Sequence, residues 1–196
     1  MNATPRARLF VAVDVPSDVL EFVEAASKPL ESSIEGARWT RRTGRHITIK
    51  FLGYTEADLL TELVDALASC SGHSPGPIRV SGLGAFPSAK RARVVWAGID
   101  DPAALLPRLA ADLDRALQTV GFEPEARAFS PHLTLARLRE PCSVERDLAS
   151  VHDLESRAFE VGSFCLYRSH LHPKGATYER LREFPLARPS DIQASC

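Results

Sequence analysis

Two octapeptides in the sequence repeat a pair of residues suited to acid–base chemistry. They are HITIKFLG at 46–53, which contains His46 and Thr48, and HLTLARLR at 132–139, which contains His132 and Thr134. Two imidazoles can share general acid and general base duties at one reacting centre near neutral pH. Two threonine hydroxyls can donate hydrogen bonds to the free oxygens of a phosphate. The pattern favours phosphodiester cleavage with no metal, no cofactor and no Ser or Cys nucleophile.

Each octapeptide predicts a β-strand with its histidine and threonine on one face. Side chains two residues apart in a strand point to the same side. The other face of the first strand is then expected to bury three apolar residues, which are Ile47, Ile49 and Phe51. A single strand histidine is more often structural than catalytic, so the interpretation depends on both pairs recurring together.

The two motifs belong to a longer internal repeat with an offset of 86 residues. Identical residues align outside the motifs as well: Asp14 with Asp100, Pro16 with Pro102, Leu20 with Leu106 and Leu52 with Leu138. The predicted elements align too, as strand, helix, strand, helix and a two-strand hairpin, twice without a gap. A register shared over about 85 residues favours internal duplication over chance. Duplication with an approximate two-fold axis would set the two His/Thr faces across a common cleft.

Hydrophobic periodicity places these motifs among alternating strands and helices. Strands are predicted over 9–15, 46–51, 78–81, 93–99, 132–137, 159–168 and 177–184. Helices are predicted over 18–28, 55–67, 101–117 and 144–149, with Pro107 as an alternative start for the third. The mixture predicts an α+β protein with a single two-lobed domain over residues 1–187 and a polar C-terminal tail over 188–196.

The composition is typical of a globular protein of the cytoplasm. The chain has 196 residues, with 24 Lys+Arg, 25 Asp+Glu and 44% hydrophobic residues. Its apolar runs are too short to span a bilayer and its N-terminus lacks a signal peptide, so no membrane partner is expected. The net charge of −1 argues against coating of duplex DNA through bulk positive charge. No obligatory protein partner is evident.

Neither the cysteines nor a second histidine pair has the spacing of a metal site. The four cysteines lie far apart and form no C-x-x-C motif: Cys70, Cys142, Cys165 and Cys196. They are expected to be reduced thiols. His170 and His172 form an H-x-H, but a surface loop is predicted there because Pro173-Lys174-Gly175 follows and no acidic or Cys ligand is adjacent.

With their flanking segments, the two H-x-T motifs make the sequence resemble the 2H phosphoesterase superfamily. Within it, the sequence looks like the bacterial and archaeal RNA 2′,3′-cyclic phosphodiesterases, also called 2′-5′ RNA ligases. The matching segments follow the family's order over nearly the whole chain: RLFVAVDVP (8–16), HITIKFLG, RARVVWAGI (91–99), FSPHLTLARL (129–138) and FCLYRSHLHPKGATYERL (164–181).

The resemblance implies a bilobal α+β fold, with two pseudo-symmetric lobes of antiparallel sheet plus helices around a central cleft. It implies hydrolysis of a 2′,3′-cyclic phosphate at an RNA or oligonucleotide end to a 2′-phosphate. His46 would be the proton donor and His132 the proton acceptor, while Thr48, Thr134 and Arg137 would hold the phosphate. Reversible 2′-5′ ligation of tRNA halves, cleavage of another small cyclic nucleotide and a non-catalytic RNA-end binding module stay open as alternatives.

Arg137 raises a geometric difficulty, because it lies five residues after His132. In a regular strand it would point away from the motif face, and it reaches a phosphate only if the strand bends or ends there. A phosphate clamp and a surface ion pair are both open for it. Other arginines near the motifs are interpreted as solvated surface in preference to an RNA guide: Arg38, Arg41, Arg42, Arg45, Arg91 and Arg93. Under the RNA-guide interpretation, Trp39 or Tyr167 would stack on a base.

Overall fold

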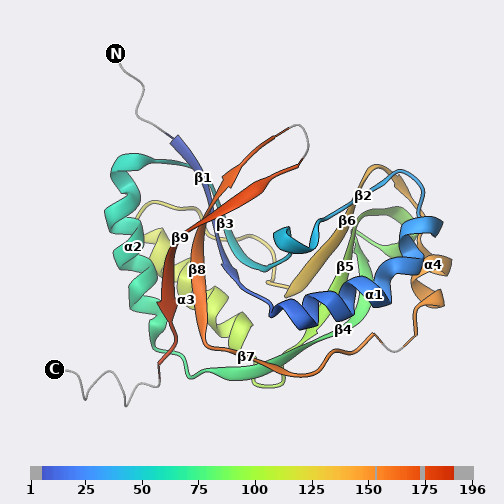
Figure 1. Cartoon of the computed structure of the whole chain (residues 1–196). Coiled ribbons are helices and arrows are strands. Elements are labelled where there is room, and N and C mark those ends of the chain that lie inside the picture. The colour runs from blue at the N-terminus through green and yellow to red at the C-terminus, as the bar shows by residue number, and fades with distance from the viewer. Residues whose placement is uncertain (1–5, 153, 173–174, 188–196) are drawn as a thin grey trace.

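A curled antiparallel sheet forms the centre of the computed structural model, which describes residues 6–152, 154–172 and 175–187 (Figure 1). Its strands are β1 (Arg6–Val13), β2 (Ala37–Trp39), β3 (Ile47–Glu56), β4 (Gly76–Phe86), β5 (Ala92–Asp100), β6 (His132–Cys142), β7 (Phe159–Val161), β8 (Ser163–His170) and β9 (Thr177–Pro185). The α-helices are α1 (Ser17–Ser33), α2 (Leu60–Ala68), α3 (Leu105–Gln118) and α4 (Glu145–Ser150). The tail predicted over 188–196 lies outside the described residues.

The order of the strands places the two motif strands at the middle of the sheet. The strands run β7-β4-β5-β6-β3-β1-β8-β9, and β2 also pairs with β6. The central strands β3 and β6 meet where Ile47 pairs with Leu133 in antiparallel fashion. These two residues lie 86 positions apart in the sequence. An antiparallel pair of residues related by the repeat offset marks a local two-fold axis through the sheet at this point.

Each lobe of the molecule carries a helix from the other half of the repeat. The helices α2 and α3 lie beside the half of the sheet that holds β1 and β8, whereas α1 and α4 lie beside β4 and β5 (Figure 1). In the chain, however, α1 follows β1 and α3 follows β5. The two halves are therefore interleaved, and the predicted bilobal α+β fold class is confirmed.

The repeat offset holds in the helices and motif strands but changes in the first strands. Four buried positions of α1 recur 86 residues later in α3: Val19 and Leu105, Leu20 and Leu106, Val23 and Leu109, Ser27 and Leu113. In the first strands, Val13 pairs with Ile47 and Ala97 pairs with Leu133, an offset of 84. The prediction of a repeat without a gap is therefore wrong by two residues here.

The turn that caps α3 accounts for the two extra residues. The carboxylate of Asp101 accepts hydrogen bonds from the backbone N–H groups of Leu105 (3.0 Å) and Leu106 (2.7 Å). The helix consequently begins at Leu105, between the two predicted starts. Pro107 lies in the first turn, where its missing N–H leaves no helix hydrogen bond unmade. Elsewhere β4 is longer than predicted, and the strand predicted over 159–168 is divided at Gly162 into β7 and β8.

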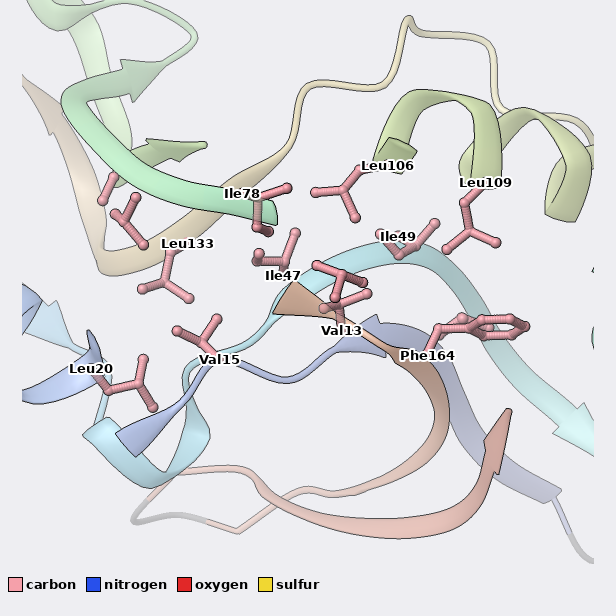
Figure 2. Packing of buried hydrophobic residues seen from close by; sticks show 14 of the residues in the cluster. Val13, Val15, Leu20, Ile47, Ile49, Ile78, Leu106, Leu109, Leu133 and Phe164 are labelled. Atoms are coloured by element: carbon pink, nitrogen blue, oxygen red, sulfur yellow. The ribbon is translucent and has the colours of Figure 1, made fainter. Parts of the chain in front are cut away.

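The hydrophobic core lies between the helices and one face of the sheet. Figure 2 shows Ile47, Ile49 and Leu133 from the motif strands packed with Leu106 and Leu109 of α3. These side chains are at most 7% exposed. Burying them fixes which way the motif strands face, so the residues that alternate with them point to the opposite side. Among the described residues, no helix is long and apolar enough to cross a membrane.

Candidate active site

The central pair of strands brings the two motifs together. Ile47 and Leu133 pair at the second position of each motif. One residue further in either direction, this register sets each histidine beside the threonine of the other motif. Four predicted residues therefore gather on the face of the sheet opposite the core: His46, Thr48, His132 and Thr134. We call this the site face.

The strand β6 contains a β-bulge directly after its motif threonine. Thr134 and Ala136 pair with consecutive residues of β5, so Leu135 has no partner on that strand. An extra residue of this kind reverses the alternation of faces beyond it. Leu135 and Ala136 are both buried, and Arg137 is exposed on the site face. The bulge at Leu135 therefore places Arg137 on the same face as the motif residues.

The strand β3 has the same bulge 86 positions earlier, at Ile49. Thr48 and Lys50 pair with consecutive residues of β1, which leaves Ile49 without a partner there. Phe51 consequently lies on the site face, where it is 58% exposed. The prediction that Phe51 is buried with the isoleucines is wrong, because it assumed regular alternation. Phe51 occupies the position in β3 that Arg137 occupies in β6.

The backbone carbonyl two residues earlier holds the ring of His132. Nδ1 of His132 lies 2.8 Å from the carbonyl oxygen of Ser130. Since a carbonyl only accepts hydrogen bonds, Nδ1 carries the proton and Nε2 of the neutral ring has a free lone pair. The backbone of Gly44, two residues before His46, raises the pKa of that imidazole.

The charges around His46 act in opposite directions. Burial lowers the pKa of His46 to about 4, whereas the carboxylate of Asp14 raises it and the charge of Arg137 lowers it. Asp14 directly follows β1, and the register of β1 with β3 sets it beside His46. Its carboxylate accepts a hydrogen bond from the Tyr167 hydroxyl (2.6 Å) and lies 3.5 Å from a guanidinium nitrogen of Arg180. An anchored carboxylate thus faces this histidine.

His132 has a glycine where His46 has an aspartate. Gly98 pairs with His132, and a Cβ atom at this position would lie 2.6 Å from the backbone oxygen of Ser81. Burial lowers the pKa of His132, and Arg137 lowers it further. Because the charge of Arg137 acts on both imidazoles, its guanidinium lies near both histidines. The structure therefore brings all five predicted site residues to one face.

Aromatic rings pack against both imidazoles. The ring of Phe10 stacks on His46 with centroids 4.7 Å apart, and Tyr178 meets the same imidazole edge-on at 5.0 Å. Phe86 meets His132 edge-on at 5.0 Å. These contacts restrict ring rotation, and they supply the low-polarity surroundings that depress both pKa values.

The arginines that precede the first motif have separate roles. Arg38 and Arg41 are exposed, as the interpretation of a solvated surface expects, and Arg42 pairs with Glu21 at 2.9 Å. The same interpretation is wrong for Arg45, which is only 5% exposed. Trp39 has its indole nitrogen buried without a hydrogen-bond partner among the described residues. It is therefore poorly placed to stack on a base.

The cysteines and the second histidine pair are not part of the two motifs, although the Sγ atom of Cys165 lies 4.0 Å from the Asp14 carboxylate. Cys70, Cys142 and Cys165 are free thiols, and Cys196 lies outside the described residues. Burial raises the pKa of Cys70, and that of Cys165 to about 11, which opposes thiolate formation. Nε2 of His170 lies 2.9 Å from the Glu179 carboxylate. Within the described ranges, no three His, Cys, Asp or Glu side chains are grouped as metal ligands.

Two residues of the site face were not predicted from the sequence, Phe51 and Asp14. Asp14 appeared only as an identity of the repeat, and no local pattern connected it with His46. Phe51 had a detectable signal. In both motifs the spacing of buried apolar residues changes from two to three, as in Ile47, Ile49 and Leu52. A change of this kind at the same place in both copies indicates a bulge.

Comparison with known proteins agrees with this geometry. The family model described as the 2′-5′ RNA ligase superfamily matches residues 15–173. An RNA 2′,3′-cyclic phosphodiesterase of Archaeoglobus fulgidus is 35% identical over 178 residues, which cover 90% of this chain and 99% of that protein. One of Aeropyrum pernix is 37% identical over 145 residues, or 72% and 82% of the two chains. The chain belongs to the 2′-5′ RNA ligase superfamily, as the two H-x-T motifs predicted.

Solved structures show the same fold. The crystal structure of TT0787 of Thermus thermophilus matches with a TM-score of 0.79 and 26% identity, covering 93% of this chain and 99% of that one. Escherichia coli LigT complexed with 3′-AMP matches with a TM-score of 0.71 and 24% identity, covering 94% and 100%. The second likeness concerns the fold alone.

Proposed function

We propose that this protein hydrolyses the 2′,3′-cyclic phosphate at an RNA end, leaving a 2′-phosphate and a free 3′-hydroxyl. The observation that carries the proposal is the pairing of two H-x-T strands at the centre of one sheet, which sets each histidine beside the other motif's threonine. The names of the Archaeoglobus and Aeropyrum relatives, both RNA 2′,3′-cyclic phosphodiesterases, support the same substrate. RNA is the expected partner.

In this proposal His132 is the general base. A water molecule attacks the phosphorus and loses its proton to Nε2, the nitrogen that the Ser130 carbonyl leaves free. Burial and Arg137 lower the pKa of His132, and the facing Gly98 provides no carboxylate to oppose them. The ring is consequently neutral at pH 7, as a base must be before it accepts a proton.

His46 is then the general acid. As the bond between phosphorus and O3′ breaks, His46 gives its proton to O3′, which leaves as the hydroxyl. The neighbouring Asp14 favours the protonated imidazole, opposing the effect of burial. A bound phosphate carries negative charge between the two rings and favours protonation further. Burial still leaves His46 with a pKa of about 4 in the free protein, so the proposed acid takes up its proton when the phosphate is bound.

The remaining site-face residues suit the phosphate. The hydroxyls of Thr48 and Thr134 donate to its two non-bridging oxygens, one from each motif strand. Arg137 adds a charge-assisted and potentially bidentate contact, which strengthens as negative charge builds on these oxygens in the transition state. Its exposed side chain and its effect on both histidines are the observations that favour a phosphate clamp over a surface ion pair.

Phe51 suits a nucleobase. It lies on the site face with 58% of its surface exposed, and it is related by the local two-fold axis to Arg137. An exposed aromatic ring beside a phosphate site can stack on a base, a contact typically contributing about 1–3 kcal/mol. Phe51 replaces Trp39 and Tyr167 as the stacking residue, since the Tyr167 hydroxyl is bound to Asp14 and its ring stacks on Phe10.

The same residues allow ligation, in which an RNA hydroxyl takes the place of water. The 5′-hydroxyl group of a second RNA end would attack the phosphorus, lose its proton to His132 and form a 2′-5′ linkage, while the bond between phosphorus and O3′ breaks and O3′ takes a proton from His46. The superfamily's description is the observation that favours testing this second activity. A non-catalytic RNA-end binding module is the alternative of a different kind.

The deciding assay uses purified protein, EDTA and an oligoribonucleotide that ends in a 2′,3′-cyclic phosphate. We expect conversion to a 2′-phosphate end, identified by comparison with synthetic 2′- and 3′-phosphate standards. A 3′-phosphate product would overturn the proposed roles, and tight binding without turnover would favour the binding module. A parallel reaction with a 5′-hydroxyl RNA measures ligation. His152→Ala, at an exposed position outside the site face, is the matched control for histidine substitutions.

A further inference from the structure

A threonine outside both motifs holds the bulge of β6. The hydroxyl of Thr40, which directly follows β2, donates toward the carbonyl oxygens of Thr134 at 2.8 Å and Leu135 at 2.9 Å. The backbone N–H of Thr40 also donates to the Leu135 carbonyl, at 2.8 Å. Successive carbonyls of a regular strand point to opposite edges, so one hydroxyl reaches both only where the strand is bulged.

The bulge determines where Arg137 points. If β6 were regular at Leu135, the alternation of faces would continue and Arg137 would lie on the core side, where Leu133 and Leu135 are fully buried. A guanidinium there would lose its hydration without gaining a phosphate. The direction of the Arg137 side chain therefore depends on the backbone conformation at Thr134 and Leu135, the two residues whose carbonyls Thr40 binds.

Arg45 supports Thr40 from the first motif. Its Nε lies 3.3 Å from the Thr40 hydroxyl oxygen and donates to it. The side chain is only 5% exposed, and burial lowers the pKa of its guanidinium, while the negative charges of Glu24 and Glu31 in α1 oppose that effect. Because Arg45 precedes His46 in the chain, this contact joins the approach to the first histidine with the bulge behind the second.

The hydroxyl of Thr40 does more than attach β2 to the sheet. The N–H of Thr40 and the pairing of Ala37, Arg38 and Trp39 with β6 already make that attachment. The hydroxyl adds contacts to two carbonyls that the bulge turns toward the same side. Its removal would leave the Thr134 carbonyl without this donor and allow the bulge to relax.

We propose that Thr40 is a positioning residue, whose hydroxyl holds the β6 bulge in the conformation that turns Arg137 toward the substrate phosphate. Arg45 orients that hydroxyl. The proposal rests on the proposed function for the identity of the phosphate, whereas the dependence of Arg137 on Thr40 does not require catalysis.

The test is a double-mutant cycle between Thr40→Val and Arg137→Ala, with Thr40→Ser as the matched control. Thr40→Val keeps the shape and removes the hydroxyl, and Thr40→Ser keeps the hydroxyl and removes a methyl. We expect Thr40→Val to lower kcat/KM for the cyclic phosphate about tenfold and to weaken binding of a nucleoside 2′-phosphate. Thr40→Ser should retain most activity. In the Arg137→Ala background, Thr40→Val should cost less than twofold.

Additive effects of the two substitutions, or an equal loss in Thr40→Ser, would overturn the proposal. Arg45→Met should cause a smaller loss that is also absent in the Arg137→Ala background, which keeps the test decisive if Thr40→Val is poorly folded. Crystal structures of wild type and Thr40→Val separate this proposal from the proposed function. An unchanged bulge and unchanged Arg137 in Thr40→Val would overturn it, whatever activity the wild-type protein shows.

Discussion

The strands β3 and β6 have the same backbone plan but differ in the residues that surround it. Each has a histidine at or directly before its start, followed by a threonine and then a bulge. The residue facing the histidine is Asp14 in one half and Gly98 in the other, and the residue beyond the bulge is Phe51 or Arg137. The symmetric backbone provides two equivalent frames, and in the proposed function a few differing residues suit them to opposite ends of one reaction.

The bulges themselves are fastened in different ways. In β3, the residue after the unpaired Ile49 is Lys50, which is 7% exposed and bound to the Asp114 carboxylate of α3 and to the Glu123 carbonyl (2.9 Å). In β6 the corresponding residue is Ala136, and Thr40 supplies the contacts from the neighbouring strand. The bulge of β3 is thus held by contacts on the core side, and the bulge of β6 is held by contacts at the edge of the strand.

The largest effect is expected when either histidine is lost. His46→Ala and His132→Ala should each lower kcat for the cyclic phosphate by roughly 10²-fold or more, the usual size for a lost general acid or base. Rapid-quench assays of RNA end groups give the rates, with His152→Ala as the control. Near-wild-type activity in either variant would contradict the proposed division of roles, because that histidine would then not be needed for catalysis.

Substitution of the residues beyond the bulges should lower kcat/KM by less, and the two substitutions should respond differently to a change of substrate. Arg137→Ala should lower kcat/KM about 30-fold, as expected for loss of a charge-assisted phosphate contact. Phe51→Ala should lower it about tenfold, mainly through KM. The discriminating substrate is a cyclic phosphate of a simple diol with no base. On it, Arg137→Ala should keep its full defect and Phe51→Ala should match wild type; the reverse pattern would contradict these roles.

Removing the carboxylate that faces His46 should lower the pKa of this histidine and leave that of His132 nearly unchanged. Asp14→Asn removes the charge that favours the His46 imidazolium, so the pKa of His46 should fall below about 4 while that of His132 changes little. We expect a loss of about fivefold in kcat/KM, since the acid is less often protonated. NMR titration of the two imidazoles checks the shift. Asp100→Asn is the matched control, because Asp100 lies near Arg79 instead. A shift confined to His132 would refute the assignment.

The last predicted effect is on the folding stability of the protein in acid, and not on the reaction rate. The pKa of His46 is about 4 in the folded protein and about 6.5 when unfolded, so between these pH values the unfolded chain binds the extra proton. His46 therefore contributes stability above pH 6.5 that is lost as the pH falls toward 4. His46→Asn should reduce this acid-induced loss between pH 7 and pH 4.5 by about 2 kcal/mol relative to wild type. Urea unfolding at pH 7, 5.5 and 4.5 measures it, and parallel curves for both proteins would contradict the assigned pKa.

Sequence alone predicted the four motif residues because they precede the bulges. As far as Thr48 and Thr134, both strands alternate regularly, so spacing and burial determine the face of each side chain. Beyond those threonines, the face depends on which backbone groups pair with the neighbouring strand, and single-sequence periodicity does not report such pairing. Phe51 was assigned to the wrong face for this reason, and Arg137 could be placed only conditionally.

Long-range partners account for the other differences. Asp14 and His46 are 32 residues apart and meet only through the register of β1 with β3. Thr40 and Leu135 meet through β2, a three-residue strand too short to show a period. The change of the repeat offset from 86 to 84 residues arises in the turn where Asp101 caps α3. Local hydrogen bonds determine that turn.

In the proposed mechanism the first motif supplies the acid and the second motif the base, and a change of leaving group tests this division most directly. The measurement compares hydrolysis of a 2′,3′-cyclic phosphate with that of an analogue whose 3′ bridging oxygen is sulfur. A thiolate leaves without protonation far more readily than an alkoxide, so the analogue needs no general acid. We predict that His46→Ala cleaves the sulfur analogue within about threefold of the wild-type rate, whereas His132→Ala is equally impaired on both substrates. Rescue of His132→Ala by the sulfur analogue, with His46→Ala still impaired, would contradict the account.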